Sequence, residues 1–295
     1  MDNDLKNKYD LTISFSGYNI KTYLQLAIKS LLYFHPEVKE CIVVFDDNST
    51  DGTKEWLKEY GIKRITWSGK YDDIIRDYDK KYPNYGVCLS YYNNIMVREI
   101  MEQTSTKYLM INDGDVVFFN KFLNTFFEKI KIYKGLFILG GYESIMLNDN
   151  RYDQYNLLYK NGMLHRVHLY NSFFDLDYFK EIDLLFDDIY DELYIDALTK
   201  HVVYIKEKDI YSMYADGGIN FLYQLYSKNI NFYTICHSSL KKSDYIYHFG
   251  WRSSFEKQKI IHNTNYINEF IDEKTFKEME SNIRLNFIIK LLTTT

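Results

Sequence analysis

The 295-residue chain contains few residues of the types that interrupt or cross-link a fold. Only Pro36 and Pro83 occur, and there is no stretch rich in Pro, Gly or Ser, so we find no candidate interdomain linker. The three cysteines, Cys41, Cys88 and Cys236, lie far apart, which argues against both a disulfide framework and a CxxC metal site. We therefore expect one compact domain with free thiols in a reducing compartment.

Long apolar runs are missing as well. No run approaches the roughly 18 to 20 residues of a membrane span, and the N-terminal MDNDLKNKYD is too polar for a signal peptide. The formal net charge of -5 argues against a broad electrostatic contact with nucleic acid, although a local basic groove stays open. These absences predict a soluble, cytoplasmic protein with no integral membrane segment.

Apolar residues are nevertheless abundant, at 46% of the chain, which is enough for a substantial core. Near the N-terminus, short apolar runs alternate with segments of helical periodicity. The predicted order is strand 11–15, helix 22–34, strand 41–45, helix 53–60 and strand 62–67. This βαβ succession predicts an α/β fold with a mainly parallel sheet.

The pattern continues with less regularity. We predict helices at 87–103, 121–132, 178–185, 192–200 and 216–228, and strands at 108–111, 116–119, in LFILGGYES and in NFYTI. Residues 142–170 show no clear period. Residues 255–295 are mostly amphipathic helix, and we expect this tail to serve core packing or a dimer contact rather than membrane attachment.

Three polar clusters follow predicted strands. In an open parallel sheet the carboxyl ends of the strands meet at one edge, and ligands bind there. The clusters are Ser16-Gly17-Tyr18-Asn19, Asp46-Asp47-Asn48 and Asp113-Gly114-Asp115. Their convergence on one rim of the sheet is the first indication of a site.

The stretch YLMINDGDVVFF places Asp113 and Asp115 between two apolar runs. Residues i and i+2 of an extended chain point the same way, and Gly114 between them allows a close approach of the backbone to a ligand. Two carboxylates offer the hard oxygen ligands that Mg²⁺ or Mn²⁺ prefers. The simpler alternative is a polar turn between two strands.

The run LTISFSGYN, then a helix, IVVFDDNSTDGTKEWL and YLMINDGD resembles the nucleotide-sugar half of family 2-like glycosyltransferases with the GT-A fold. The resemblance covers residues 10–120. It implies a mixed, mainly parallel sheet flanked by helices, here with a helical C-terminal tail. The chain departs from the family in having Ser-Gly where Pro-Thr is commoner in the first loop.

The resemblance also implies roles for individual residues. Ser16 and Tyr18 match the first-loop contacts to the nucleobase, and Asp47 matches the acid that binds the base or ribose. Asp113 matches the residue near the ribose, and Asp115 the metal-binding carboxylate.

Inverting transfer further needs a carboxylate that deprotonates the acceptor hydroxyl, and we expect it in the second half of the chain. Asp216 is the first candidate, because MYADGGINF looks like the family's (E)D segment, with Ala215 in place of Glu. Its alternative interpretation is a helix N-cap. The acidic run 187–192 is the second candidate, but such runs are typically solvated faces.

The segment YIYHFGWRSS supplies further candidates. A late His completes the metal shell in many GT-A enzymes, so the resemblance makes His248 a metal ligand, although a structural His is the simpler alternative. Arg252 has the geometry to hold phosphate in a bidentate manner. Lys70 and Arg76 are also possible diphosphate contacts, with solvated charge as the plainer interpretation.

We therefore predict a metal-dependent, inverting glycosyltransferase that uses Mn²⁺ or Mg²⁺ and a nucleotide-diphosphate sugar, with UDP favoured by family habit. Its catalytic domain would span 1–254, with a nucleotide-sugar half at about 10–120 and an acceptor half at about 121–254, followed by a helical extension at 255–295. The acceptor hydroxyl could belong to a glycan, a protein or a hydroxymethylated base of phage DNA, and oligomers could form through the C-terminal helices.

Two alternative functions stay open at this point. One is a non-catalytic nucleotide- or glycan-binding relative of the same family. The other is a sugar-phosphate nucleotidyltransferase, which is disfavoured because FSGYNIKTY lacks the Gly-rich loop expected after the first strand.

Overall fold

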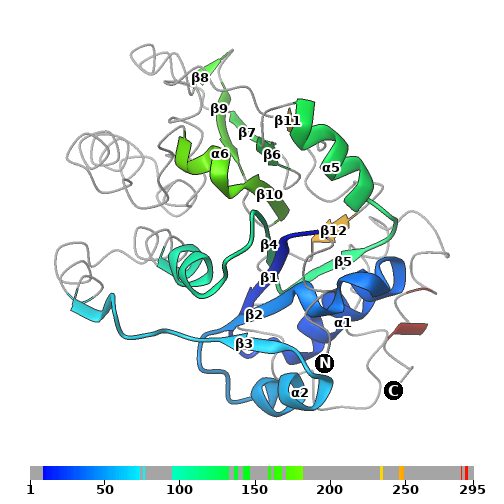
Figure 1. Ribbon diagram of the computed structural model, residues 1–295, viewed down its shortest axis with the longest axis vertical. Coiled ribbons are helices and arrows are strands. Elements are labelled where there is room, and N and C mark those ends of the chain that lie inside the picture. The colour runs from blue at the N-terminus through cyan, green and yellow to red at the C-terminus, as the bar shows by residue number, and fades with distance from the viewer. Residues whose placement is uncertain are drawn as a thin grey trace.

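A computed structural model describes the part of the chain that carries the candidate site (Figure 1). The described residues are 9–73, 76, 95–132, 136–138, 142–146, 159–160, 163–167, 171–181, 233–234, 246–248, 287 and 290–291. The predicted helices 192–200 and 216–228 lie outside them.

The centre of the fold is a seven-stranded sheet with the strand order β11-β6-β10-β4-β1-β2-β3. Its strands are β1 (Leu11–Gly17), β2 (Ile42–Asp46), β3 (Lys63–Ile65), β4 (Tyr108–Asp113), β6 (Leu136–Ile138), β10 (Asn171–Asp175) and β11 (Tyr233–Thr234). Neighbouring strands from β4 to β3 are parallel, whereas β10 runs antiparallel to both β4 and β6. The predicted mixed, mainly parallel sheet is therefore confirmed.

Helices lie on both sides of this sheet, with α1 and α5 on one side and α6 on the other (Figure 1). Their bounds are Lys21–Phe34 for α1, Pro36–Cys41 for the 3-10 helix η2, Thr53–Tyr60 for α2, Leu123–Ile132 for α5 and Leu176–Glu181 for α6. Residues 95–103 are also helical. Among the described helices, none is long and apolar enough to cross a membrane.

Several helix ends follow local signals. α2 ends at Gly61, which has a φ of 74° and donates its backbone N–H to Lys58 O, as a left-handed C-cap does. α6 begins at Leu176, two residues before the predicted start, because Asp175 Oδ1 accepts the backbone N–H groups of Asp177 and Tyr178.

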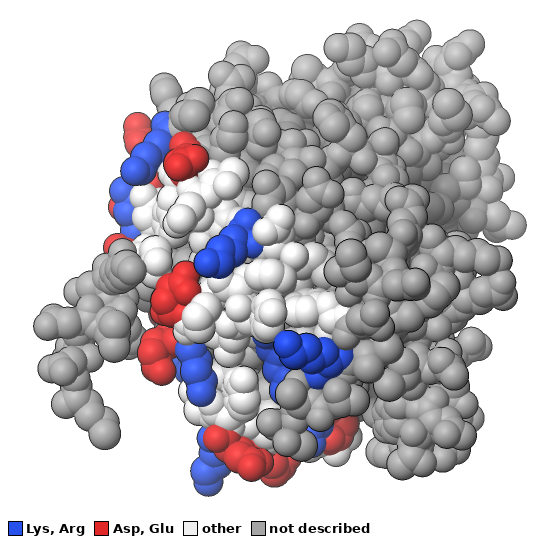
Figure 2. Space-filling model, turned by 90° about the vertical axis from the view of Figure 1, so that its right-hand side faces the viewer, with Lys and Arg blue, Asp and Glu red and all other residues white. Residues whose placement is uncertain are grey.

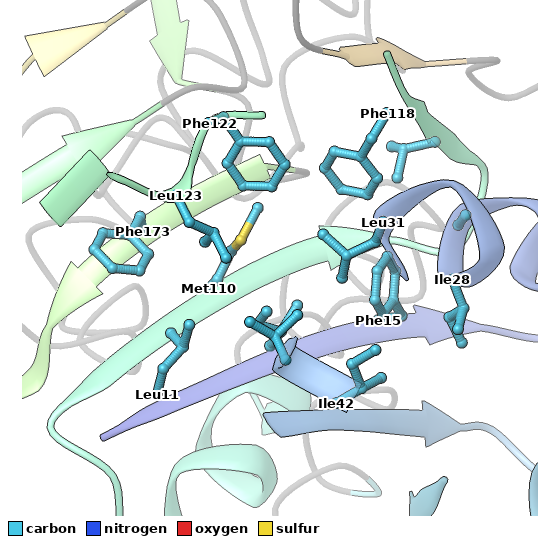
Figure 3. Close-up of a cluster of buried hydrophobic side chains, with 14 of the residues drawn as sticks. Leu11, Phe15, Ile28, Leu31, Ile42, Met110, Phe118, Phe122, Leu123 and Phe173 are labelled. Atoms are coloured by element: carbon cyan, nitrogen blue, oxygen red, sulfur yellow. The ribbon is translucent and has the colours of Figure 1, made fainter. Parts of the chain in front are cut away.

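The main core lies between the sheet and α1 and α5 (Figure 3). Alternate residues of β1, including Leu11, Ile13 and Phe15, face this core, as the two-residue period of a strand requires. Aromatic rings extend the core from Phe118 to Phe122 and on to Phe126. Burying a side chain of this size contributes about 1.5–3 kcal/mol, so this cluster holds the strands in place beneath the rim.

Two smaller sheets complete the described structure. β5 (Val116–Phe118) pairs antiparallel with β12 (Ile246–His248), and β9 (Met163–Val167) pairs with β7 (Tyr142–Met146) and β8 (Tyr159–Lys160). The second of these sheets lies in the segment for which the sequence showed no period.

The C-terminal residues pack against α1. The Phe287 ring contacts the rings of Tyr33 and Phe34, and Lys29 Nζ donates to Leu291 O over 3.4 Å. Residues 287, 290 and 291 are helical, and the rest of the predicted tail 255–295 lies outside the described residues. For the described part of the tail, packing against the core is therefore the observed role.

Candidate active site

The strand register brings the three polar clusters to one edge of the sheet. Ser16 pairs with Asp113 across β1 and β4, and Gly17 pairs with Asp46 across β1 and β2. All three strands are parallel and end at this edge (Figure 1). The convergence that the sequence predicted is therefore present, and we call this edge the rim.

Hydrogen bonds tie the loop after β1 to the loop after β2. Asn19 donates its backbone N–H to Ser49 Oγ over 2.9 Å, and its side-chain Oδ1 accepts the N–H of Thr50 over 2.7 Å. The N–H of Lys21 donates to Asp51 Oδ2 over 2.8 Å. Asn19 has a φ of 53°, a left-handed conformation that Asn tolerates better than most residues. The two loops thus form one connected unit.

Asn19 and Asp51 therefore have a structural role that their sequence positions did not predict. Their signal is visible in retrospect, because both are short polar residues in loops that follow buried strands. Such residues typically hydrogen-bond to nearby backbone. What the sequence does not show is that their partners lie on the other loop.

Asp46 and Asp47 have different environments. Asp46 is fully buried, accepts from Arg64 Nε over 2.6 Å and accepts the Ser49 N–H over 3.0 Å. Asp47 is exposed on the rim and accepts from the indole Nε1 of Trp67. Because Asp46 is fully buried and both of its carboxylate oxygens accept hydrogen bonds from the protein, it has a structural role. Of these two carboxylates, Asp47 is therefore the one that is exposed to solvent at the rim.

Gly114 is held against β1. Its N–H donates to Ser16 O over 2.8 Å, and a Cβ added there would lie 2.7 Å from that same oxygen and 2.6 Å from Ile20 Cδ1. The close approach that we expected from a ligand is therefore already made by the protein's own backbone. The turn that carries Asp113 and Asp115 is fixed to the end of β1.

A buried polar ladder lies directly beneath this turn. Asn112 Nδ2 donates to Ser14 O over 3.0 Å, and Asn171 Nδ2 donates to Asn112 Oδ1. Asn112 and Asn171 are both essentially inaccessible to solvent. The ladder links β1, β4 and β10, and it explains why an Asn stands in the apolar run YLMIND. Asn171 was not singled out by the sequence, because its partner lies 59 residues away.

The chain that follows the turn is fastened to α1. The Phe118 N–H donates to Ser30 Oγ over 3.0 Å, and the Phe122 N–H donates to His35 Nε2 over 3.1 Å. Burial lowers the pKa of His35 below its usual value, and a weaker opposing effect comes from the hydrogen bond to Glu37. A neutral imidazole is what accepting the Phe122 N–H requires.

The predicted site residues are placed as follows. Asp113 is half-buried and Asp115 is 5% exposed, while the Tyr18 ring is 54% exposed at the rim and Ser16 is half-buried beside Asp113 in the register. The backbone of His248 pairs with Val116, the residue after Asp115. Asp216 and Arg252 lie outside the described residues, as does the acidic run 187–192.

Two other sequence candidates, Lys70 and Arg76, form exposed ion pairs. Lys70 Nζ forms an exposed ion pair with Glu102 over 2.6 Å, and Arg76 forms one with Asp73 over 3.0 Å. The hydrogen bond that Lys70 Nζ donates to Glu102 raises the pKa of Lys70 and lowers the pKa of Glu102. For both cations the solvated interpretation is the better one.

Within the described residues, no three His, Cys, Asp or Glu side chains are grouped as a complete metal site. Asp113 and Asp115 supply hard oxygen ligands at a turn, which is a chemical set that fits a divalent ion sharing its remaining positions with phosphate and water. Cys41 is a half-buried free thiol whose pKa is raised by burial, and it lies away from the rim at the start of β2.

Comparison with known families now adds to this geometry. Residues 16–183 match the model of the family described as Glycosyl transferase family 2. The match spans more than half of the chain, so the protein belongs to glycosyl transferase family 2. Membership disfavours the nucleotidyltransferase alternative. A search of curated proteins gave no significant match.

Several solved structures are similar to this chain at low sequence identity. S. aureus TarS is 14% identical with a TM-score of 0.43, and the alignment covers 81% of this chain and 36% of TarS. Core-mannan synthase A (CmsA/Ktr4) from Aspergillus fumigatus, in its Mn/GDP form, is 12% identical with a TM-score of 0.46. The alignment covers 82% of this chain and 75% of the synthase. The mannosyltransferase PcManGT from Pyrobaculum calidifontis, in complex with GDP-Man and Mn²⁺, is 12% identical with a TM-score of 0.37, covering 60% and 48%. This chain thus spans about a third of TarS.

Proposed function

We propose that this glycosyltransferase moves a sugar from a nucleotide-diphosphate sugar, with UDP favoured, to an acceptor hydroxyl with inversion at the anomeric carbon. The observation that carries the proposal is the rim, where parallel strands bring Tyr18, Asp47, Asp113 and Asp115 to one edge of the sheet. An exposed aromatic ring beside exposed and half-buried carboxylates suits a nucleoside diphosphate, because a ring stacks on a base and carboxylates accept from ribose hydroxyls.

In this proposal Ser16 and Tyr18 contact the base, Asp47 accepts from the base or ribose, and Asp113 lies near the ribose. Asp115 and His248 would hold Mn²⁺ or Mg²⁺, whose positive charge offsets the charge of the diphosphate. The pairing of His248 with Val116 supports this, because Val116 directly follows Asp115 in the chain. Arg252 would add bidentate contacts to phosphate.

The chemistry requires one proton transfer. The acceptor oxygen attacks the anomeric carbon, and the bond from that carbon to the diphosphate oxygen breaks, so the leaving diphosphate takes the bonding electron pair. The acceptor's proton passes to a carboxylate on the opposite face of the sugar. We assign that role to Asp216, which the family resemblance favours.

We further propose that 1–254 forms the catalytic domain and 255–295 an extension of it. The contacts of Phe287 with α1 support an extension that packs on the donor half. The acceptor belongs to a glycan, a protein or a modified DNA base. On the described part of the face in Figure 2, acidic and basic side chains lie interspersed, which gives no support to a single basic surface for DNA.

The test is a screen for nucleotide-diphosphate release from UDP- and GDP-sugars in the presence of Mn²⁺ or Mg²⁺. Turnover of a nucleotide sugar is expected, and Asp115→Ala should reduce it by about a hundredfold or more. Asp177→Ala is the matched control, because it removes an exposed carboxylate on α6 that has no role in the proposal. Turnover should be unchanged in this variant.

Because Asp115 is buried, the variant's fold is checked by thermal denaturation, and Asp115→Asn provides a conservative second variant. The proposal fails when the wild-type protein neither binds nor turns over any nucleotide sugar. The assignment of Asp115 as a metal ligand is wrong if a folded Asp115→Asn variant retains wild-type turnover.

A further inference from the structure

Trp67 stands two residues beyond β3 and reaches the carboxylate of Asp47 at the end of β2. Its indole Nε1 donates to Asp47 Oδ1, a contact between residues 20 apart in the chain. β3 is the neighbour of β2 in the sheet (Figure 1), and Phe45 pairs with Ile65 in the register. The rim is thereby extended by one strand, from β2 to β3.

The indole is itself held in place. Its ring packs edge-to-face on Phe45, with centroids 4.7 Å apart and an angle of 80° between the planes. Phe45 is 2% exposed, so the surface on which the indole rests is part of the rigid interior. The Trp67 N–H is therefore a fixed donor rather than a mobile surface group.

The backbone of Asp47 is bonded to the end of β1, whereas its side chain faces solvent. Its backbone N–H donates to Gly17 O over 3.3 Å, and the following residue, Asn48, has a φ of 54°. The side chain is exposed. An exposed carboxylate normally samples several rotamers, and fixing one of its oxygens selects a single orientation.

We infer that Trp67 is a positioning residue for the donor nucleoside: it orients the Asp47 carboxylate so that its other oxygen accepts from the base or ribose. This inference rests on the proposed function, which gives Asp47 that contact. A carboxylate only accepts hydrogen bonds, and an indole N–H only donates, so the pair leaves an acceptor at the rim. The ligand class is a nucleoside diphosphate with an N–H or O–H directed at Asp47.

The test compares Trp67→Phe with the wild-type protein. Phenylalanine retains a ring for packing on Phe45 and removes only the N–H donor. The expected results are an increase of about tenfold in the Kd for UDP and in the KM for the UDP-sugar, with kcat within about twofold. KM should change more than kcat because, in the proposal, Asp47 contacts the nucleoside, which is remote from the reacting carbon.

The matched control is Trp56→Phe. Trp56 is a half-buried residue on α2, and its ring stacks on Tyr60 with centroids 5.3 Å apart. Trp56→Phe therefore makes the same chemical change on a helix instead of at the end of a strand. UDP affinity should be unchanged in this variant. A second check uses the Asp47→Ala background, in which Trp67→Phe should have no further effect on affinity.

The outcomes separate this inference from the proposed function. A wild-type protein that binds no nucleoside diphosphate overturns the proposed function and the inference with it. A wild-type protein that binds UDP, together with an equally tight Trp67→Phe variant, overturns the inference alone. Additive losses in the double variant also overturn it, because Trp67 would then act by a route other than Asp47.

Discussion

The first half of the central sheet and strand β10 of the second half reach the rim in opposite directions, whereas β6 and β11 run in the same direction as β4. In the first half β1, β2 and β4 are parallel and end there, each followed by a polar loop or turn. In the second half β10 is antiparallel to β4 and begins there, with Asn171 opposite Asn112. The first half therefore places polar side chains at the rim in loops that follow its strands. The second half places Asn171 there, at the start of β10, and the pairing of β10 with β4 fixes its position.

This difference shows how each half is held. The loops of the first half are joined by hydrogen bonds from Asn19 to Ser49 and Thr50, and by the bond from the Lys21 N–H to Asp51. The halves are joined instead by the antiparallel pairing of β4 and β10, to which the buried Asn171–Asn112 bond and the bond from the Phe122 N–H to His35 add. Three substitutions test these attachments, starting with the largest expected effect.

Gly114→Ala tests the packing within the first half. The new Cβ would lie 2.7 Å from Ser16 O, and the strand pairing of β1 and β4 leaves that backbone little room to move. We expect a loss of about 1–3 kcal/mol in the free energy of unfolding. Since the turn carries Asp113 and Asp115, turnover should fall about tenfold or more, as displaced site residues typically cause. Urea denaturation and turnover assays measure the two effects.

Gly61→Ala is the control for this substitution. Gly61 has a φ of 74°, but a Cβ there meets nothing within 4 Å. Gly61→Ala should lower the free energy of unfolding by about 1 kcal/mol through backbone strain alone, and turnover should be unchanged. Wild-type turnover in a folded Gly114→Ala variant would show that the turn tolerates displacement from β1.

Asn171→Ala tests the link between the halves. It removes the donor to Asn112 Oδ1 and leaves a buried amide oxygen without that partner. We expect a loss of about 1–3 kcal/mol in unfolding free energy, measured by urea denaturation.

Lys107→Ala is the comparison, because it also acts between β4 and β10 but at the other end of the strands. The Lys107–Asp175 ion pair is 3.6 Å long, and the Lys107 side chain is 40% exposed, so its removal should cost about 0–1 kcal/mol. Equal costs for the two variants would mean that the rim end is no more firmly joined than the far end.

His35→Gln tests the attachment of the chain entering α5, and its effect is the smallest. The folded-state pKa of His35 lies below the usual value of 6.5, so the unfolded chain binds the proton more readily. Stability is therefore fully present above pH 6.5 and declines as the pH falls toward the lowered folded pKa. Glu37 opposes this shift and Lys121 adds to it.

A pKa that is lower by one in the folded state corresponds to about 1.4 kcal/mol of pH-dependent stability. Thermal or urea denaturation between pH 7.5 and pH 5 should show a smaller decline for His35→Gln than for the wild-type protein. An equal decline in both would assign the pH dependence to other groups.

Local signals in the sequence predicted many elements well. Helix 53–60 was predicted with its observed ends, because Gly61 permits the left-handed cap. β1 extends to Gly17 rather than ending at Phe15, since Ser16 and Gly17 still have partners on β4 and β2. β3 ends at Ile65 instead of Trp67, because its last partner on β2 is Phe45.

The second half was predicted less well. β7 and β9 pair over five residues each, yet YESIM and MLHRV carry charged or polar residues that obscure a regular period. Their strand conformation depends on pairing with each other, which is stronger than the local preference of either segment. Asp216 and Arg252 remain predictions from the resemblance.

By itself, the sequence determined the order of strands and helices in the first half, and with it the rim on which three polar clusters meet. The physical reason is local: strand and helix periods, turn residues and the handedness of parallel connections act over short stretches of chain. Tertiary structure alone decided that Asp46 is buried against Arg64 while Asp47 faces solvent beside Trp67, and that Gly114 is pressed against Ser16. These contacts join residues that are distant in sequence, so they exist only once the strands have paired and the core has closed.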